Sequence, residues 1–169
     1  MTDRVGHVIE AWRRLQPDWD LTGMAVFGRL ARLQRTIELQ RAPVLADAGL
    51  TSSDVDLLSA LLRSPDGLRP RDLRAHMMVG SGTLTAGLDR LEEAGYLQRR
   101  PDPDDRRGRI IFLTDTGRDI LVVVVQDLLE VENRLLASSP PEVVHTLAHG
   151  LEAIIGDLEQ PLPSTPDST

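Results

Sequence analysis

Two neighbouring arginines stand where they could bind phosphate groups. Arg106 and Arg107 follow the acidic turn PDPDD and precede Gly108, between two runs typical of strands, Tyr96–Arg100 and Arg109–Leu113. The planar guanidinium group matches phosphate in its donor geometry and also fits a narrow minor groove of duplex DNA. The segment therefore predicts a β-hairpin with arginine at its tip. The alternative is a solvated surface loop whose acids neutralise its arginines.

Two short helices are predicted directly before this hairpin. Pro70 suits the first turn of a helix over Pro70–Met77, since a residue there needs no N–H. The connection Gly80–Gly82 allows a sharp turn into a second helix, Thr83–Glu93, whose first turn is small and rich in hydroxyl groups. Small side chains let a helix N-terminus approach a DNA groove, where the helix dipole favours phosphate. Two helices followed by a hairpin describe a winged helix-turn-helix.

The stretch from Ser81 to Leu121, SGTLTAGLDRLEEAGYLQRRPDPDDRRGRIIFLTDTGRDIL, resembles the winged helix-turn-helix regulators of the MarR type. The pieces LDRLEEAGYLQRR, DRRG and LTDTG carry this resemblance together. It implies a mainly α fold with a small β-wing, and a homodimer that binds double-stranded DNA. For such a dimer we expect repression at a pseudo-palindromic operator. The resemblance also implies release by a small anionic or phenolic ligand.

The expected domain organisation follows from this layout. Residues 1–48 would form N-terminal helices for dimerisation and support, and residues 49–113 the winged helix-turn-helix DNA-binding lobe. Residues 114–160 would form C-terminal dimerisation helices. The polar, proline-rich residues 161–169 predict a disordered tail.

Helical periodicity supports the flanking parts of this layout. Apolar residues recur every three or four positions through Leu21–Leu45, and Leu50–Leu62 predicts a further helix capped by Thr51 or Ser52. A long helix is predicted from Thr114 onward, although its valine run 122–125 taken alone would favour a strand.

A second apolar series follows the break at Ser138–Pro141. Its members share a three–four spacing and are Val144, Leu147, Leu151, Ile154 and Leu158. Such a seam suits a contact between helices. It could join two subunits or pack within one, and the resemblance favours the dimer.

The candidate DNA contacts lie on the second helix, the helix before it and the wing. They are Arg71, Arg74, Ser81, Gly82, Thr83, Thr85, Arg90, Arg106, Arg107 and Arg109. The hydroxyl residues would contact phosphates or base edges, the arginines before the turn would hold the backbone, and the wing arginines would enter the minor groove. For Arg90 the alternative is a salt bridge to Asp89, Glu93 or a neighbouring helix.

The charge distribution agrees with this assignment better than the net charge does. The formal net charge is −7, which alone argues against a nucleic-acid binder. Residues 63–113 hold ten arginines and eight acids, so their charge is +2 and the remainder carries −9. There is no cysteine, which excludes disulfides and thiolate metal ligands. The longest apolar stretch, Ile120–Val125, is too short to span a bilayer, so we expect a cytoplasmic protein.

An effector pocket is implied by a finer resemblance, to the urate-responsive branch of these regulators. Trp12 and Trp19 lie in an N-terminal extension like that of the branch, and Trp12, Asp56 and Arg99 would occupy three of its ligand-binding positions. Gly87 stands where the branch has an arginine, which argues against urate itself. Alternatively, Trp12 packs an extra helix, and Asp56 forms a buried pair with an arginine.

Other function classes have weak support in the sequence. His145 and His149 stand four residues apart on a predicted helix, but no HExxH motif and no further ligand accompany them, so we expect no metal site. The segment GSGTLTAG lacks both GxGxxG and the P-loop lysine, and an enzyme is not expected; no cofactor is expected either. The alternative function is a winged-helix protein-interaction module without specific DNA binding.

Overall fold

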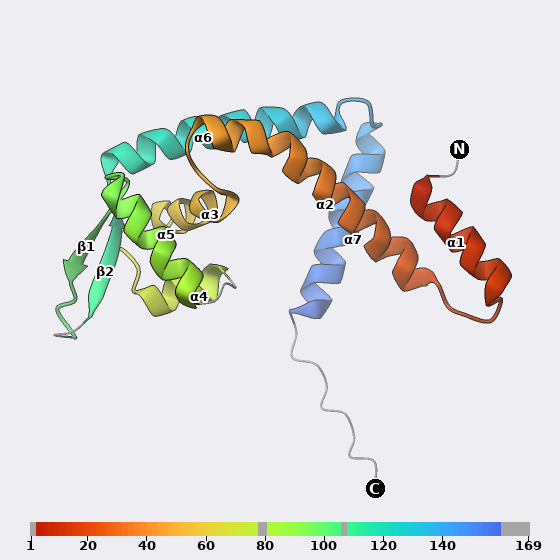
Figure 1. The fold of residues 1–169 in the computed structure, drawn as a ribbon, viewed down its shortest axis with the longest axis horizontal. Helices are drawn as coiled ribbons and strands as arrows, with labels where there is room; N and C mark the ends of the chain where they lie inside the picture. Colours follow the sequence, from red (N-terminus) through yellow and green to blue (C-terminus); the bar gives the residue numbers. More distant parts are fainter. Residues whose placement is uncertain (1–2, 78–80, 106–107, 160–169) are drawn as a thin grey trace, which may run out of the picture. The chain divides into compact units, whose positions relative to one another are not determined.

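The computed structural model describes residues 3–77, 81–105 and 108–159. In chain order the elements are α1 (Arg4–Leu15), α2 (Thr22–Asp47), α3 (Ser52–Leu62), α4 (Pro70–Met77), α5 (Ser81–Glu93), β1 (Leu97–Pro101), β2 (Arg109–Leu113), α6 (Asp115–Leu136) and α7 (Pro141–Leu158) (Figure 1). The prediction of a mainly α fold with a small β-wing is confirmed. In the described ranges, no helix has the length and apolarity needed to cross a bilayer.

The chain divides into two compact units, one ending at Val131 and the other beginning at Glu132. The first contains the helix-turn-helix and the wing, and the second contains α7. The boundary falls inside α6, a continuous helix. The predicted tail, residues 161–169, lies outside the described residues.

The predicted elements lie close to the observed ones. The helix Pro70–Met77 and the strand Arg109–Leu113 have the predicted bounds, whereas β1 begins and ends one residue later than predicted. Helix α5 begins at Ser81 rather than Thr83. The valine run 122–125 lies within α6, so the helical period of the flanking residues outweighs the strand preference of four β-branched side chains.

Capping interactions fix where two of the helices begin. The Asp3 carboxylate accepts the Gly6 N–H at 2.6 Å and so begins α1. Thr51 and Asp54 form a reciprocal capping box at the start of α3, in which the Thr51 hydroxyl accepts the Asp54 N–H and the Asp54 carboxylate accepts the Thr51 N–H. Each cap supplies acceptors for N–H groups that the helix cannot satisfy itself.

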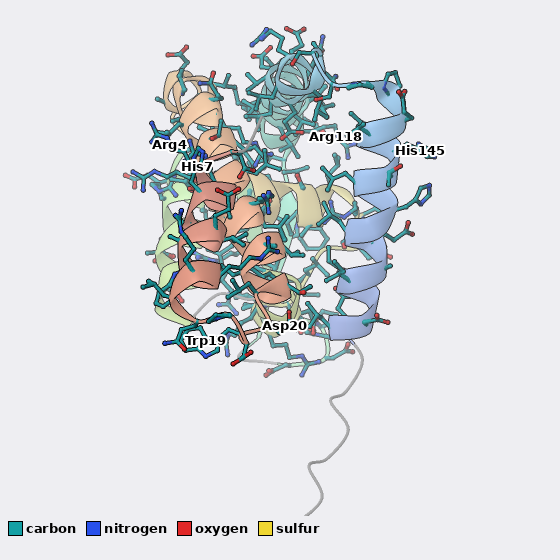
Figure 2. The ribbon with its side chains drawn as sticks, turned by 90° about the vertical axis from the view of Figure 1, so that its right-hand side faces the viewer. Arg4, His7, Trp19, Asp20, Arg118 and His145 are labelled. Atoms are coloured by element: carbon teal, nitrogen blue, oxygen red, sulfur yellow. The ribbon has the colours of Figure 1, made fainter. Side chains whose placement is uncertain are left out.

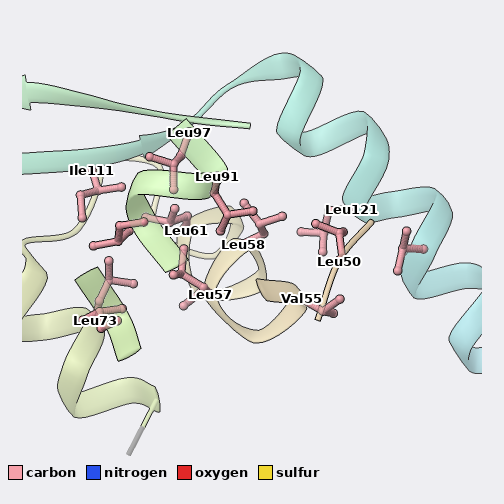
Figure 3. Packing of buried hydrophobic residues seen from close by; sticks show 14 of the residues in the cluster. Leu50, Val55, Leu57, Leu58, Leu61, Leu73, Leu91, Leu97, Ile111 and Leu121 are labelled. Atoms are coloured by element: carbon pink, nitrogen blue, oxygen red, sulfur yellow. The ribbon is translucent and has the colours of Figure 1, made fainter. Parts of the chain in front are cut away.

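One apolar core supports both α5, which is the second helix of the helix-turn-helix and is called the recognition helix below, and the wing (Figure 3). Its most deeply buried side chains are Leu57, Leu58, Leu61, Leu73, Leu91, Leu97, Ile111 and Leu121. They come from α3, α4, α5, both strands and α6. Truncating any one of these leucines to alanine would cost about 2–5 kcal/mol. The two short helices α4 and α5 and the wing therefore pack on the same hydrophobic core.

The wing is tied to the segment before α4 as well as to its own partner strand. β1 and β2 pair antiparallel, with Leu97 opposite Leu113. Leu68 adds a bridge to Ile111 through two backbone hydrogen bonds of 3.0 and 2.9 Å. Gly67 makes this possible: its φ is +76°, and a Cβ there would lie 2.8 Å from the Ile111 carbonyl oxygen. A side chain at position 67 would push the segment before α4 away from β2.

The junction between the wing and α6 is equally close. A Cβ on Gly117, in the first turn of α6, would lie 2.0 Å from the Tyr96 carbonyl oxygen. The Thr114 hydroxyl donates to the Gly95 carbonyl at 2.7 Å and accepts the Gly117 N–H at 3.0 Å. The start of α6 is therefore packed directly against the backbone that enters β1.

Candidate nucleic-acid interface

The C-terminal half of α5 is held by an ion pair with α3. The Arg90 Nη2 lies 2.6 Å from Asp54 Oδ1, and the Asp54 side chain is 2% exposed while that of Arg90 is 47% exposed. Burial alone would raise the pKa of Asp54, but the hydrogen bonds from Arg90 and Thr51 outweigh it, so the pKa is lowered. Of the roles considered for Arg90, the structure shows the salt bridge to a neighbouring helix.

The same half of α5 is also held by the wing. The guanidinium of Arg99, on β1, lies 2.6 Å from Asp89 Oδ1 and 2.5 Å from Glu92 Oε2. Its backbone N–H donates to the other carboxylate oxygen of Glu92 at 3.1 Å. Charge-assisted pairs of this kind fix orientation as well as distance. Arg99 therefore sets the position of β1 against the recognition helix.

The N-terminal half of α5 has both exposed and buried residues. Thr85 and Ala86 are exposed, whereas Leu84 and Leu88 face the core. Ser81, Gly82 and Thr83 form the first turn of α5, and their side chains lie outside the described part of the structure. The ion pairs of α5 described above all fall in its C-terminal half.

Two acids of the wing loop, Asp102 and Asp104, pair with an arginine that lies outside the loop. Arg69, just before α4, forms a two-pronged pair with Asp102, with Nε 2.5 Å from Oδ2 and Nη2 3.1 Å from Oδ1, and also lies 2.8 Å from Asp104 Oδ2. The hydrogen bonds from Arg69, followed by that from the Asp104 N–H, lower the pKa of Asp102 to about 2. Arg106 and Arg107 themselves lie outside the described residues. The alternative of a loop whose acids neutralise these two arginines therefore stays a prediction, and the structure shows that Asp102 and Asp104 also bind Arg69.

A groove of about 600 Å³ separates the first turn of α4 from the wing loop. Arg71 and Arg109 line it together with Arg69, and Asp104 and Asp105 line it too. The Arg71 side chain is 74% exposed and lies 3.5 Å from Asp72, a loose surface pair. Arg109 is exposed and donates to the Gly108 carbonyl at 2.9 Å. Arg74 is also exposed on α4. These arginines can reach outward from the same side as the wing loop.

Each of the three residues expected to bind an effector has different neighbours in the structure. Trp12 stacks on Trp19, with ring centroids 5.4 Å apart and planes at 21°. Asp56 is exposed on α3, so the expectation that it forms a buried pair with an arginine is wrong. Asp54 forms that pair instead, because residues two apart on a helix face different directions. Arg99 is engaged by α5, as described above.

Sequence reasoning missed the residues that hold the interface together: Arg69, Asp102 and Asp54. Only Asp54 had a local signal, since an acid three residues after Thr51 suggests a capping box. Arg69 and Asp102 are 33 positions apart in the chain, and no spacing rule links them.

Helices α4 and α5 with the hairpin β1–β2 define the protein as a winged helix-turn-helix protein. Residues 48–108 match the model of the MarR family. The chain is 34% identical to the HTH-type transcriptional regulator PecS of Dickeya dadantii over 161 residues, which cover 94% of each chain. A structure of an E. coli MarR variant complexed with operator DNA is similar, with 25% identity, a TM-score of 0.66 and coverage of 85% of this chain and 96% of that one. The transcriptional repressor CouR bound to a 23-mer DNA duplex has 25% identity, a TM-score of 0.69 and coverage of 82% and 99%. The chain belongs to the MarR family of transcriptional regulators.

Proposed function

We propose that this chain is a repressor that binds a pseudo-palindromic operator as a homodimer, with α5 in the major groove and the wing at the minor groove. The observation that carries the proposal is the way α5 is held. Its C-terminal half is fixed by Arg90–Asp54 and by the Arg99 pairs, and Thr85 and Ala86 in its N-terminal half are exposed. A helix held in this way keeps its reading end in a fixed register on the duplex.

We assign a separate role to each group of residues in the candidate DNA interface. Arg71 and Arg74 hold the phosphate backbone from α4, and Arg109 does so from β2. Thr85 and the first turn of α5 contact phosphates or base edges. The wing arginines Arg106 and Arg107 enter the minor groove. Arg90 is assigned to positioning the helix, because its guanidinium is already bound to a buried carboxylate.

The homodimer is supported by the apolar residues of the second unit. Helix α7 is described throughout, and none of its residues is buried. Leu147 is 44% and Leu158 64% exposed, and both belong to the three–four seam. A contiguous exposed apolar stripe on a monomer marks an interaction surface. A second copy of α7 offers the complementary stripe, and a twofold dimer would present two reading helices.

We further propose that a small anionic or phenolic compound releases the operator. The exposed Trp12–Trp19 stack supports an aromatic ligand, since flat rings bind stacked rings well. A thermal-shift series with phenolic acids and purines tests this step. A binding compound raises the melting temperature by mass action, and the rise should disappear in Trp12→Ala. If no compound shifts the wild-type protein, ligand release is wrong while DNA binding stands.

The DNA-binding proposal is tested by gel shift against the promoter of the protein's own gene over a range of salt concentrations. We expect a dissociation constant on the order of nanomolar and a steep loss of affinity with salt. Arg106→Ala with Arg107→Ala should reduce the slope of log affinity against log salt by about 2. The matched control replaces the adjacent pair Arg13 and Arg14 on α1 and should leave the slope unchanged. A wild-type protein with only weak, sequence-independent binding would instead favour a protein-interaction module.

A further inference from the structure

Two histidines of α7 converge on one point beside the helix. His145 and His149 are one turn apart, and their Nε2 atoms lie 3.1 Å from each other. Their rings meet edge to face with centroids 4.6 Å apart. Both side chains are exposed, and His145 projects from α7 (Figure 2). The two Nε2 atoms are therefore within hydrogen-bonding distance of each other.

We propose that His145 and His149 form a two-nitrogen binding site for a divalent transition-metal ion. Neutral imidazole suits the ions of nickel, copper and zinc. Metal–imidazole bonds are about 2.0–2.1 Å long. An ion bound at that length to two nitrogens 3.1 Å apart has a nitrogen–metal–nitrogen angle of about 95–100°. To accept an ion, the hydrogen bond between the two Nε2 atoms must break and the rings must rotate so that both lone pairs point at the metal.

The general order of affinity ranks the candidate ions. Copper stands above both nickel and zinc in this order for sites made of nitrogen ligands, so we expect Cu²⁺ to bind most tightly.

A carboxylate lies near one of the two histidines. Glu152 Oε2 lies 3.4 Å from Nδ1 of His149, on the side of the ring away from Nε2. When Nδ1 carries the ring proton, the Nε2 lone pair is left for the metal, and a carboxylate close to Nδ1 favours that tautomer. This arrangement of carboxylate, imidazole and metal is common in metal sites.

The site lies apart from the proposed dimer seam. On the helical wheel of α7, His145, His149 and Glu152 fall on the face opposite Leu147, Leu151 and Leu158. Within the described ranges no group of three or more histidine, aspartate or glutamate side chains could hold a metal ion together. Water would therefore complete the coordination. This inference goes beyond the proposed function and holds whether or not the chain binds DNA.

The test uses the full chain without an affinity tag, treated with chelator and titrated with NiCl₂ and then CuCl₂ in a calorimeter. We expect one tightly bound ion per chain. His145→Ala and His149→Ala should each weaken binding about a hundredfold, because each removes one arm of the chelate. His7→Ala, which removes a lone exposed histidine on α1, should leave this binding unchanged. Glu152→Gln should weaken it about tenfold.

A spectroscopic measurement separates the pair from single-histidine binding. Electron paramagnetic resonance of the copper-loaded protein should show two equatorial nitrogens, and one or none after either alanine substitution. Alanine favours helix, so the variants should keep the far-ultraviolet circular dichroism of the wild type. If each single variant binds as tightly as the wild type, or if the wild type binds no more tightly than a single imidazole, the proposal is wrong.

Discussion

Asp54 closes the capping box of α3 with one side of its carboxylate and binds Arg90 of α5 with the other. One buried acid therefore fixes both the start of the supporting helix and the rotation of the recognition helix. Its carboxylate accepts hydrogen bonds from Thr51 and Arg90, so Asp54 positions α5 against α3.

Arg90→Ala should destabilise the protein by leaving this carboxylate buried without its cation. We expect the free energy of unfolding at pH 7 to fall by about 2 kcal/mol, less than for a fully buried pair because Arg90 is half exposed. Urea denaturation measures it. The control Arg74→Ala, an exposed arginine on α4, should change stability by less than about 0.5 kcal/mol. Equal losses in the two variants would contradict the positioning role of Arg90.

The contact between Arg69 and Asp102 should produce an acid-sensitive wing. The pKa of Asp102 is lowered in the folded state from 3.8 to about 2, so its ionised form is favoured by folding. Its contribution is fully present above the ordinary value of 3.8 and is lost as the pH falls toward 2. Asp102→Asn should therefore be less stable than wild type at pH 7, with the difference shrinking below pH 4. Thermal unfolding across this range measures the difference.

Asp66→Asn is the matched control for that experiment, since Asp66 is an exposed carboxylate in the turn before α4. Its unfolding should track the wild type at every pH. A gap between wild type and Asp102→Asn that stays constant from pH 7 to pH 2 would show that the ion pair is not the source of the difference.

Gly117→Ala should be strongly destabilising, because the added Cβ would lie 2.0 Å from a backbone oxygen of Tyr96 that cannot move alone. We expect a loss of about 3 kcal/mol, at the upper end for an overpacked position. Gly150→Ala on α7 meets no atom within 4 Å and should instead stabilise by about 0.5–1 kcal/mol through helix propensity. Denaturant midpoints of the two variants should move in opposite directions.

Leu151→Glu should weaken the proposed dimer, since it places a charge in the middle of the apolar seam of α7. Sedimentation velocity at micromolar concentration should shift toward a monomer and gel shifts should lose affinity. Ala153→Glu puts the same charge on an exposed position of the same helix, away from the seam. It should sediment as the wild type does. A wild-type protein that is itself monomeric at these concentrations would overturn the dimer.

The local elements of this fold follow from the sequence because their signals are local. Proline at the start of α4, glycine around the turns and the β-branched and aromatic residues of Arg109–Leu113 each act within a few residues. The helical period around the valine run 122–125 extends over several turns, which is why it predicts α6 correctly. Burial of the whole apolar stripe outweighs the propensity of four residues.

The ion pairs of the candidate site could not be predicted in this way. Arg90 has the acids Asp89 and Glu93 beside it in sequence, yet it pairs with Asp54, 36 positions away. The choice depends on which helix α5 packs against, and packing is a property of the whole core. The same holds for Asp102, whose partner Arg69 is brought near by the Leu68 bridge.

The bridge between Leu68 and Ile111 also bears on how such a regulator could be switched. Together with the ion pairs between Arg99 and α5, this bridge links the hairpin to the two short helices. A movement of the hairpin alone would have to break these contacts. In the dimer proposed above, the proposed ligand would therefore act by changing the distance or the tilt between the two copies of this unit.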